Sequence, residues 1–257
     1  VTDDNGTPND TSDDWFYYYV PVKDKASEAA GQDPFAIGVA KSKSPLGPWK
    51  DAIGKPLLTT SQTQIETIDP AFFVDEDGTG YLHFGTFGTQ LAIKMKKDAT
   101  TGRTSYTETE TKADGTTPNL HTMKDADNNA NGPKGFFEAA WVFRKGDTYY
   151  NVYDGGKPGS GTATCVESNY QACIQYSTSD SPLGPWKYQG VIVPSGSATT
   201  MHPSVLQFGD KWYVTYHTGD KEGGTDFRRA VCIDEVDWTA DGQMTSTAHP
   251  TKAEKTQ

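Results

Sequence analysis

Three polar side chains sit at the edge or in the middle of apolar segments, and together they could perform acid–base chemistry. Asp69 opens the run at 68–74, and Glu138 is the only charge in the run at 135–143. His202 holds a place in a later apolar run that corresponds to the place of Asp69. A polar or charged group in such a segment is costly unless it faces water or a partner. These three residues are therefore the first candidates for a functional site.

Glu138 has the strongest claim to chemistry. Its neighbours Phe137 and Trp141 predict burial, and burial raises the pKa of a carboxyl group because it disfavours the anion. A raised pKa suits a general acid that works near neutral pH. Each residue also has a purely structural interpretation. Glu138 could be a buried residue satisfied by backbone donors, Asp69 could form an Asp-Pro turn that opens its strand, and His202 could be structural.

If the fold brings these two carboxyl groups and the histidine together at one pocket, they favour hydrolysis of a glycosidic bond. Such enzymes place an acid and a second carboxylate on either side of the bond that breaks. Glycosidases have either a narrow or a wide distance between their two catalytic carboxyl groups, and the wide distance leaves room for an attacking water.

The elements that must position these residues follow from a repeat. SPLGPWK occurs at Ser44–Lys50 and at Ser181–Lys187, each time after an aromatic strand, a loop and a second strand. Two more aromatic strands, at 80–84 and 211–216, follow Gly and Asp turn signals. Four such units predict an all-β fold, a β-propeller with about four blades in this chain. A β-sandwich is the alternative.

Within this fold we expect the SPLGPWK heptad to form a turn at the blade edge, with its Trp packed between blades. The polar stretch 96–136 is expected to be a long insertion loop. Its Asp125–Asn129 segment resembles a calcium loop only at first glance, because Ala130 and Phe136 stand where an EF-hand needs Gly and Glu.

Composition narrows the class of partner. The net charge of −11 makes nucleic acid a poor partner. No apolar run approaches the length of a transmembrane helix, so we expect no membrane partner. Cys165 and Cys173 could form a local disulfide, whereas Cys232 lies in an apolar strand and is expected to be a buried free thiol.

At these residues the chain resembles glycoside hydrolase family 43. The segments that carry the resemblance are IDPAFFVDEDGTGYLHFG, GFFEAAWVFRKGDTYY, TSDSPLGPWKYQG, HPSVLQFGDKWYVTYH and FRRAVCIDEVDWTADGQM, and they span almost the whole chain. The resemblance implies a five-bladed propeller that inverts the anomeric centre. It implies Glu138 as the general acid and Asp69 as the carboxylate that orients the acid and tunes its pKa.

The resemblance also implies substrate-binding and metal residues. Arg229 resembles the family's pocket arginine, with Arg228 as the alternative because a shift of one residue reverses the strand face. Phe72 and Trp141 are expected as pocket walls. His202 resembles the central histidine, which lies near a possible Ca²⁺ on the propeller axis, reached through water. No organic cofactor is expected.

One part of the family pattern has no counterpart here. The family's general base is an Asp of the first blade, and this sequence opens inside what resembles the second blade. We therefore assign no general base. The expectation is a single catalytic domain over 1–257 that is N-terminally incomplete, with a missing segment as a partner. The alternative is a chain that has lost its base.

The leading function is that of an inverting, secreted glycosidase. It would remove α-L-arabinofuranosyl or β-D-xylosyl units from arabinoxylan, xylan or arabinan oligosaccharides. An endo-arabinanase is ranked lower. The alternatives from other classes are a carbohydrate-binding propeller without turnover and a protein-interaction propeller.

Overall fold

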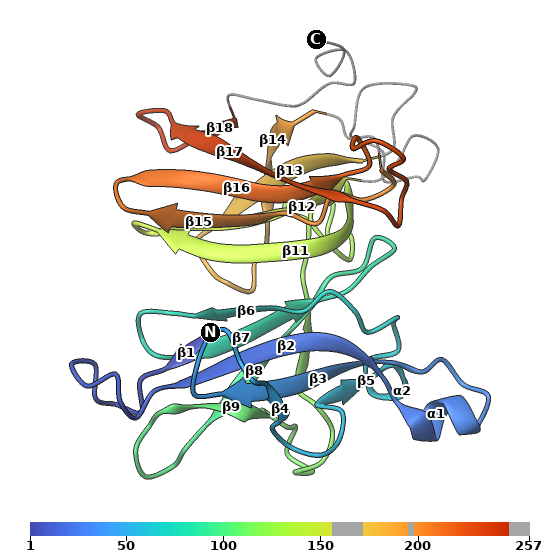
Figure 1. Ribbon diagram of the computed structural model, residues 1–257, viewed down its shortest axis with the longest axis vertical. Coiled ribbons are helices and arrows are strands. Elements are labelled where there is room, and N and C mark those ends of the chain that lie inside the picture. The colour runs from blue at the N-terminus through green and yellow to red at the C-terminus, as the bar shows by residue number, and fades with distance from the viewer. Residues whose placement is uncertain (156–171, 195–197, 247–257) are drawn as a thin grey trace. The chain divides into compact units, whose positions relative to one another are not determined.

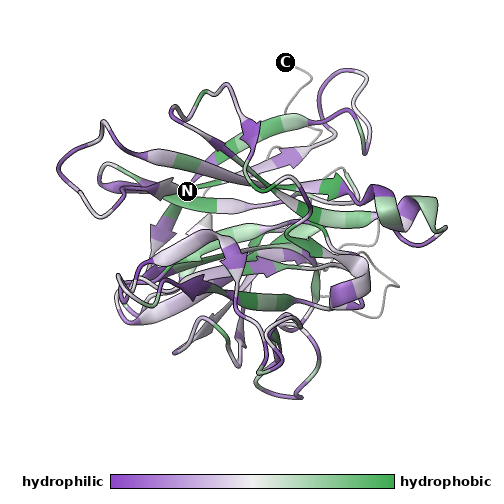
Figure 2. Cartoon of the chain, turned by 90° about the horizontal axis from the view of Figure 1, so that it is seen from below, coloured by the Kyte–Doolittle hydropathy of each residue, from purple (hydrophilic) through white to green (hydrophobic). Residues whose placement is uncertain are grey.

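The computed structural model describes residues 1–155, 172–194 and 198–246, and it is built almost wholly from antiparallel strands (Figure 1). The strands form four consecutive sheets of four or five strands each. The predicted all-β class and the predicted number of blade-like sheets are therefore confirmed. Most of the hydrophobic residues lie on strands (Figure 2).

The first two sheets belong to one compact unit, formed by Val1–Thr86 and Leu91–His121. The first sheet has the order β1-β2-β3-β4, with β5 also pairing β3. Its strands are β1 (Thr2–Asp3), β2 (Trp15–Lys23), β3 (Phe35–Ser42), β4 (Lys50–Asp51) and β5 (Leu58–Thr59). Two short helices, α1 (Lys25–Ala29) and α2 (Thr60–Thr63), join its strands or follow them. Asp24 caps α1 by accepting from the amides of Ala26 and Ser27.

The second sheet has the order β10-β8-β7-β6, with β9 also pairing β8. Its strands are β6 (Ala71–Val74), β7 (Gly80–Phe84), β8 (Leu91–Lys97), β9 (Thr104–Thr109) and β10 (Leu120–Thr122). The sequence predicted one long insertion loop over 96–136, but this stretch contains strands. It contributes β9 and β10 to this sheet, because the Thr-rich run of β9 can pair with β8 while most of it stays only half-buried.

The second compact unit is formed by Phe87–Gln90 and Thr122–Gln257. Its sheets follow the simple orders β11-β12-β13-β14 and β15-β16-β17-β18. The strands are β11 (Phe136–Lys145), β12 (Thr148–Gly155), β13 (Cys173–Ser179), β14 (Lys187–Val193), β15 (Ser204–Phe208), β16 (Lys211–Thr218), β17 (Ala230–Trp238) and β18 (Met244–Ser246).

Each unit has its own apolar core. In the first unit Ile37, Leu82 and Ile93 are fully buried, and they come from β3, β7 and β8. In the second unit Val152, Ile174 and further strand residues form the corresponding cluster. These cores fix the strands, and the candidate residues lie at strand ends or at irregular positions next to them.

Candidate active site

Asp69 and His202 occupy equivalent positions in two sheets. Each precedes a proline and the first strand of its sheet, β6 or β15, and each has a left-handed backbone, with φ of 56° and 46°. In both places the preceding carbonyl accepts a hydrogen bond at or just after the second strand, from Gly85 N at 3.2 Å and from His217 N at 2.8 Å. A left-handed backbone is costly for a non-glycine residue and is concentrated at functional sites. The correspondence predicted from the sequence therefore extends to the backbone.

Glu138 lies on β11 at an irregular point of the ladder. Its Cα partner is Asp154 of β12, and the register shifts on both sides of this pair. The next residue, Ala139, has a left-handed backbone with φ of 58°. Bulges of this kind re-aim a side chain and are over-represented next to active sites. Glu138 is half-buried, as a group that must exchange protons with a substrate needs to be.

Asp154 is a fully buried carboxylate that the sequence analysis missed. It accepts hydrogen bonds from Met201 N at 2.9 Å and from His202 N at 3.1 Å. A buried polar group left without a hydrogen-bond partner costs about 1–3 kcal/mol, and these bonds avoid that cost. Asp154 therefore ties the hairpin that carries Glu138 to the segment that carries His202. The available signal was an acid closing an aromatic strand that has no other charge.

Arg229 reaches the same region from the start of β17. Its Nη2 donates to Thr200 Oγ1 at 3.2 Å, and that oxygen lies 3.3 Å from Nε2 of His217. Its Nε also donates to the backbone carbonyl of Asp226. The guanidinium is thus held beside an imidazole that the sequence analysis did not single out.

Arg228, the alternative pocket arginine, is directed elsewhere. Its backbone exchanges hydrogen bonds with Thr225 in a tight turn, and its guanidinium lies over Gly223. The structure therefore brings Arg229 into the cluster and leaves Arg228 in the turn.

The electrostatics connect Glu138, His202, His217 and Arg229 as one cluster in the second unit. Desolvation by the surrounding protein lowers the pKa of His202, the charge of Arg229 lowers it further, and the charge of Glu138 opposes this effect. Desolvation, Arg229 and His202 together lower the pKa of His217 to about 4. Both imidazoles are therefore neutral near pH 7 and can accept a hydrogen bond from a substrate hydroxyl.

Two residues expected as pocket walls make packing or hydrogen-bond contacts within their own units. The ring of Phe72 stacks on Tyr19, with centroids 4.7 Å apart, and packs against Tyr106 at 5.6 Å in the core of the first unit. Trp141 donates its Nε1 hydrogen to the carbonyl of Val205 at 2.8 Å and so joins β11 to β15. Asp69 belongs to the first unit and is half-buried at the start of β6.

The residues around His202 do not fit a directly bound calcium ion. Calcium takes about six to eight oxygen ligands, whereas an imidazole offers a nitrogen. In the described ranges, no group of three or more His, Cys, Asp and Glu side chains is arranged to hold a metal ion. We therefore derive no step that passes through a metal.

Comparison with known proteins gives consistent matches over most of the chain. The profile of glycosyl hydrolases family 43 matches residues 10–244. A xylosidase/arabinosidase of Bacteroides ovatus is 28% identical over 247 residues, 89% of this chain and 68% of that protein. An arabinoxylan arabinofuranohydrolase of Bacillus subtilis is 32% identical over 190 residues, 70% of this chain and only 35% of that protein.

Solved structures give the same result. An α-L-arabinofuranosidase from Clostridium thermocellum is 27% identical, with a TM-score of 0.63 over 92% of this chain and 70% of that one. A β-xylosidase/α-arabinofuranosidase from a compost metagenome, solved with xylotriose, is 25% identical, with a TM-score of 0.64 over 91% of this chain and 70% of that one. These likenesses confirm the β-propeller fold class.

Proposed function

Because the chain belongs to glycosyl hydrolase family 43, we propose that it is an inverting glycosidase of plant hemicellulose. It would release α-L-arabinofuranosyl or β-D-xylosyl units from arabinoxylan, xylan or arabinan oligosaccharides. The names of the two relatives and of the two solved structures support this substrate class. The observation that carries the proposal is that Glu138 and His202 both lie beside the buried Asp154, and that Glu138 and Arg229 both act electrostatically on His202.

Glu138 would be the general acid of a direct displacement. Water attacks the anomeric carbon from the face opposite the leaving group, the glycosidic C–O bond breaks, and the Glu138 proton goes to the leaving oxygen. Asp69 would orient this acid and keep its pKa high through like-charge proximity. Neutral His202 and the fixed Arg229 would bind substrate hydroxyls and hold the sugar in place.

The base that takes the proton of the attacking water would come from a segment outside these 257 residues. The family places it in a blade for which this chain has no counterpart motif, and the relatives extend beyond the matched region. The comparisons name hydrolases and give no support to the non-catalytic alternative.

An exogenous anion tests this arrangement. In the chain alone we expect slow hydrolysis of 4-nitrophenyl α-L-arabinofuranoside and β-D-xyloside. Azide should accelerate it, because its nitrogen can attack the anomeric carbon without a base to deprotonate it. The product should be a glycosyl azide of inverted configuration, and the faster substrate would identify the sugar.

The controls separate the acid from the base. Glu138→Ala should remove the azide-dependent release of sugar from a natural oligosaccharide, whose leaving group needs protonation. A folded chain that binds no pentoside and responds to no anion would overturn the proposed function.

We also propose that the protein is secreted, and that any calcium ion near His202 is held through water. A disulfide at Cys173 supports an oxidising compartment; Cys165, the partner expected from the sequence, lies outside the described residues. Cys232 keeps its thiol and is partly buried, not fully buried as expected. Neither helix of the described residues has the length and apolar character needed to cross a membrane. Isothermal titration with Ca²⁺ before and after His202→Ala tests the metal proposal.

A further inference from the structure

The segment 199–202 connects three parts of the second unit. Asp154 of β12 accepts hydrogen bonds from two of its amides. An amide of β16 donates to the carbonyl of Met201 at 2.8 Å. The loop before β17 reaches the other end of the segment, because the Asp226 carboxylate accepts from Thr199 N at 2.8 Å. The segment is therefore fixed at three points, and it belongs to the candidate active site.

Thr200 places one hydroxyl group between two side chains that can bind a sugar. Its Oγ1 accepts from Arg229 Nη2 at 3.2 Å and lies 3.3 Å from His217 Nε2. Thr200 is 9% exposed, and a hydrogen bond is electrostatically stronger where water is excluded. The hydroxyl therefore holds the guanidinium and the imidazole at a fixed separation, although they come from different elements, the start of β17 and β16.

A tight turn holds Arg229 from the other side. Thr225 N donates to Arg228 O at 3.1 Å, and Arg228 N donates back to Thr225 O at 3.2 Å. Asp226 lies inside this turn, where its carboxylate accepts from Thr199 N and its backbone carbonyl accepts from Arg229 Nε. Asp226 therefore ties the turn to the neighbouring segment and also orients the guanidinium.

The guanidinium of Arg229 keeps donors that a ligand can use. Arginine has five N–H donors. Within the described residues, one donor on Nε and one on Nη2 are used, so three remain. The side chain is exposed, and these donors can therefore reach a ligand in solvent. The charge of Arg229 acts on His202 and His217. Because Glu138 acts on His202 as well, these donors belong to the cluster of the proposed general acid.

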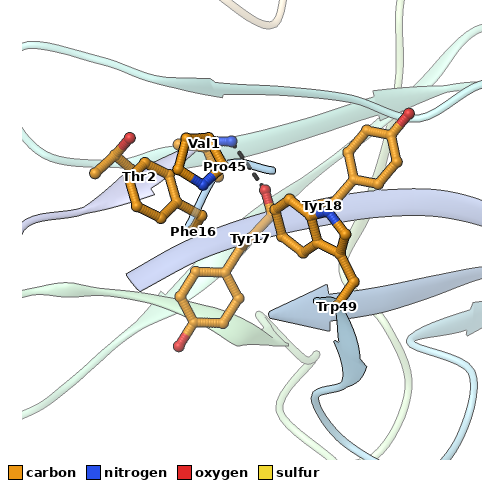
Figure 3. Close-up of a pocket in the computed structure, with 7 residues that line it drawn as sticks. All are labelled: Val1, Thr2, Phe16, Tyr17, Tyr18, Pro45 and Trp49. Atoms are coloured by element: carbon orange, nitrogen blue, oxygen red, sulfur yellow. Dashed lines mark hydrogen bonds between the residues drawn. The ribbon is translucent and has the colours of Figure 1, made fainter. Parts of the chain in front are cut away.

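An exposed surface of the first unit has a different character. Trp186 of the second SPLGPWK turn is fully buried, as expected, whereas Trp49 of the first is 37% exposed. Figure 3 shows a hollow of about 390 Å³ that Trp49 and aromatic residues of β2 line. No charged side chain of the described residues lines this hollow, whereas the Thr200 network combines a charge with oriented hydrogen-bonding groups. A selective site for a small ligand needs such precisely placed polar groups.

We infer that Thr200 and Asp226 are positioning residues for the binding of the pentosyl unit. They hold Arg229 and His217 as a pair that binds two neighbouring hydroxyl groups of the sugar, which arabinofuranosyl and xylosyl units both carry. Thr200 sets the separation of the pair, and Asp226 sets the direction of the guanidinium. A pair that is already in place lowers the entropy cost of binding. The identity of the sugar rests on the proposed function, whereas the positioning does not depend on hydrolysis.

Thr200→Val tests the positioning, because it removes the hydroxyl group and keeps the shape of the side chain. Thr200→Ser keeps the hydroxyl group and is the rescue variant, and Thr245→Val removes an exposed hydroxyl group of β18 as the control. The first readout is the NMR signal of the Arg229 Nε–H group in the 257-residue chain, assigned with Arg229→Ala. Loss of one hydrogen bond to a charged group should speed the exchange of this hydrogen with solvent about tenfold in Thr200→Val. The rescue and control variants should exchange at the wild-type rate.

The second readout is the azide-dependent turnover of the faster 4-nitrophenyl pentoside. Thr200→Val should raise KM about tenfold and change kcat little, because Arg229 binds the sugar equally in the ground state and in the transition state. In an Arg229→Ala background the same substitution should leave KM unchanged, because Thr200 acts through Arg229. A merely structural Thr200 would change KM equally in both backgrounds.

Asp226 gives a second, independent pair of variants. Asp226→Ala should speed the exchange of the Arg229 Nε hydrogen and raise KM, whereas Asp226→Asn keeps an acceptor oxygen and should have a smaller effect. An unchanged exchange rate in both Thr200→Val and Asp226→Ala would overturn the inference, and so would an equal change in KM with and without Arg229. A wild-type chain that turns over no pentoside would contradict the proposed function, and the exchange rates would still decide the positioning.

Discussion

Replacement of Asp154 gives the sharpest prediction about the cluster. Its carboxylate accepts from two buried backbone amides, those of Met201 and His202. Each buried amide left without an acceptor costs about 1–3 kcal/mol, so Asp154→Ala should cost about 2–6 kcal/mol of unfolding free energy. At about 2–4 °C per kcal/mol, the melting temperature should fall by roughly 4–24 °C. Asp154→Asn keeps an acceptor oxygen and should cost about half as much.

Differential scanning calorimetry of the two variants measures this effect. The matched control is Asp147→Ala, which removes a fully exposed carboxylate at the turn of the same hairpin and should leave the melting temperature unchanged. Turnover of an aryl pentoside with azide should also fall in Asp154→Asn, because the variant holds the backbone amide of His202 less firmly. A melting temperature for Asp154→Ala equal to that of the control would refute the role of Asp154 as the tie.

Three further predictions follow. Burial lowers the pKa of His83 from 6.5 to about 3, so His83 is protonated in the unfolded chain before it is protonated in the folded one as the pH falls. Between about pH 7 and 4.5 the wild type should therefore lose about 2.5 kcal/mol of stability that the His83→Gln variant does not lose. Urea unfolding of both proteins at both pH values would show this difference. Trp141→Phe removes the hydrogen bond to Val205 and should cost about 1 kcal/mol in the same assay. Arg229→Lys should lower kcat/KM about tenfold or more, and Arg228→Lys should change it little, as initial rates on an aryl pentoside would show.

Local patterns in the sequence were sufficient for the strands. The strands β2, β7, β12 and β16 were recognised from two signals, their aromatic, β-rich composition and the Gly and Asp turns that bound them. Both signals depend only on neighbouring residues. β9 was missed because its Thr-rich run is half-buried for most of its length and has no apolar alternation. Its place in the sheet comes from pairing with β8, which composition does not reveal.

The site was predicted only where a residue stands out in its own segment. Glu138 and His202 do so, and the structure places them in one electrostatic cluster. Asp154 acts through amides 47 and 48 positions away, so no local pattern reveals its role. The stacking of Phe72 on Tyr19 depends on core packing, which the strand pattern alone does not fix, so its role as a pocket wall stays a prediction.

The most direct test of the account compares the effect of Glu138→Ala on two leaving groups, with azide present in every assay. The account predicts a loss of several orders of magnitude on an arabinoxylan oligosaccharide, whose leaving oxygen must be protonated. It predicts a much smaller loss on the 4-nitrophenyl pentoside, whose leaving group departs without a proton. Equal losses on both substrates would contradict Glu138 as the general acid.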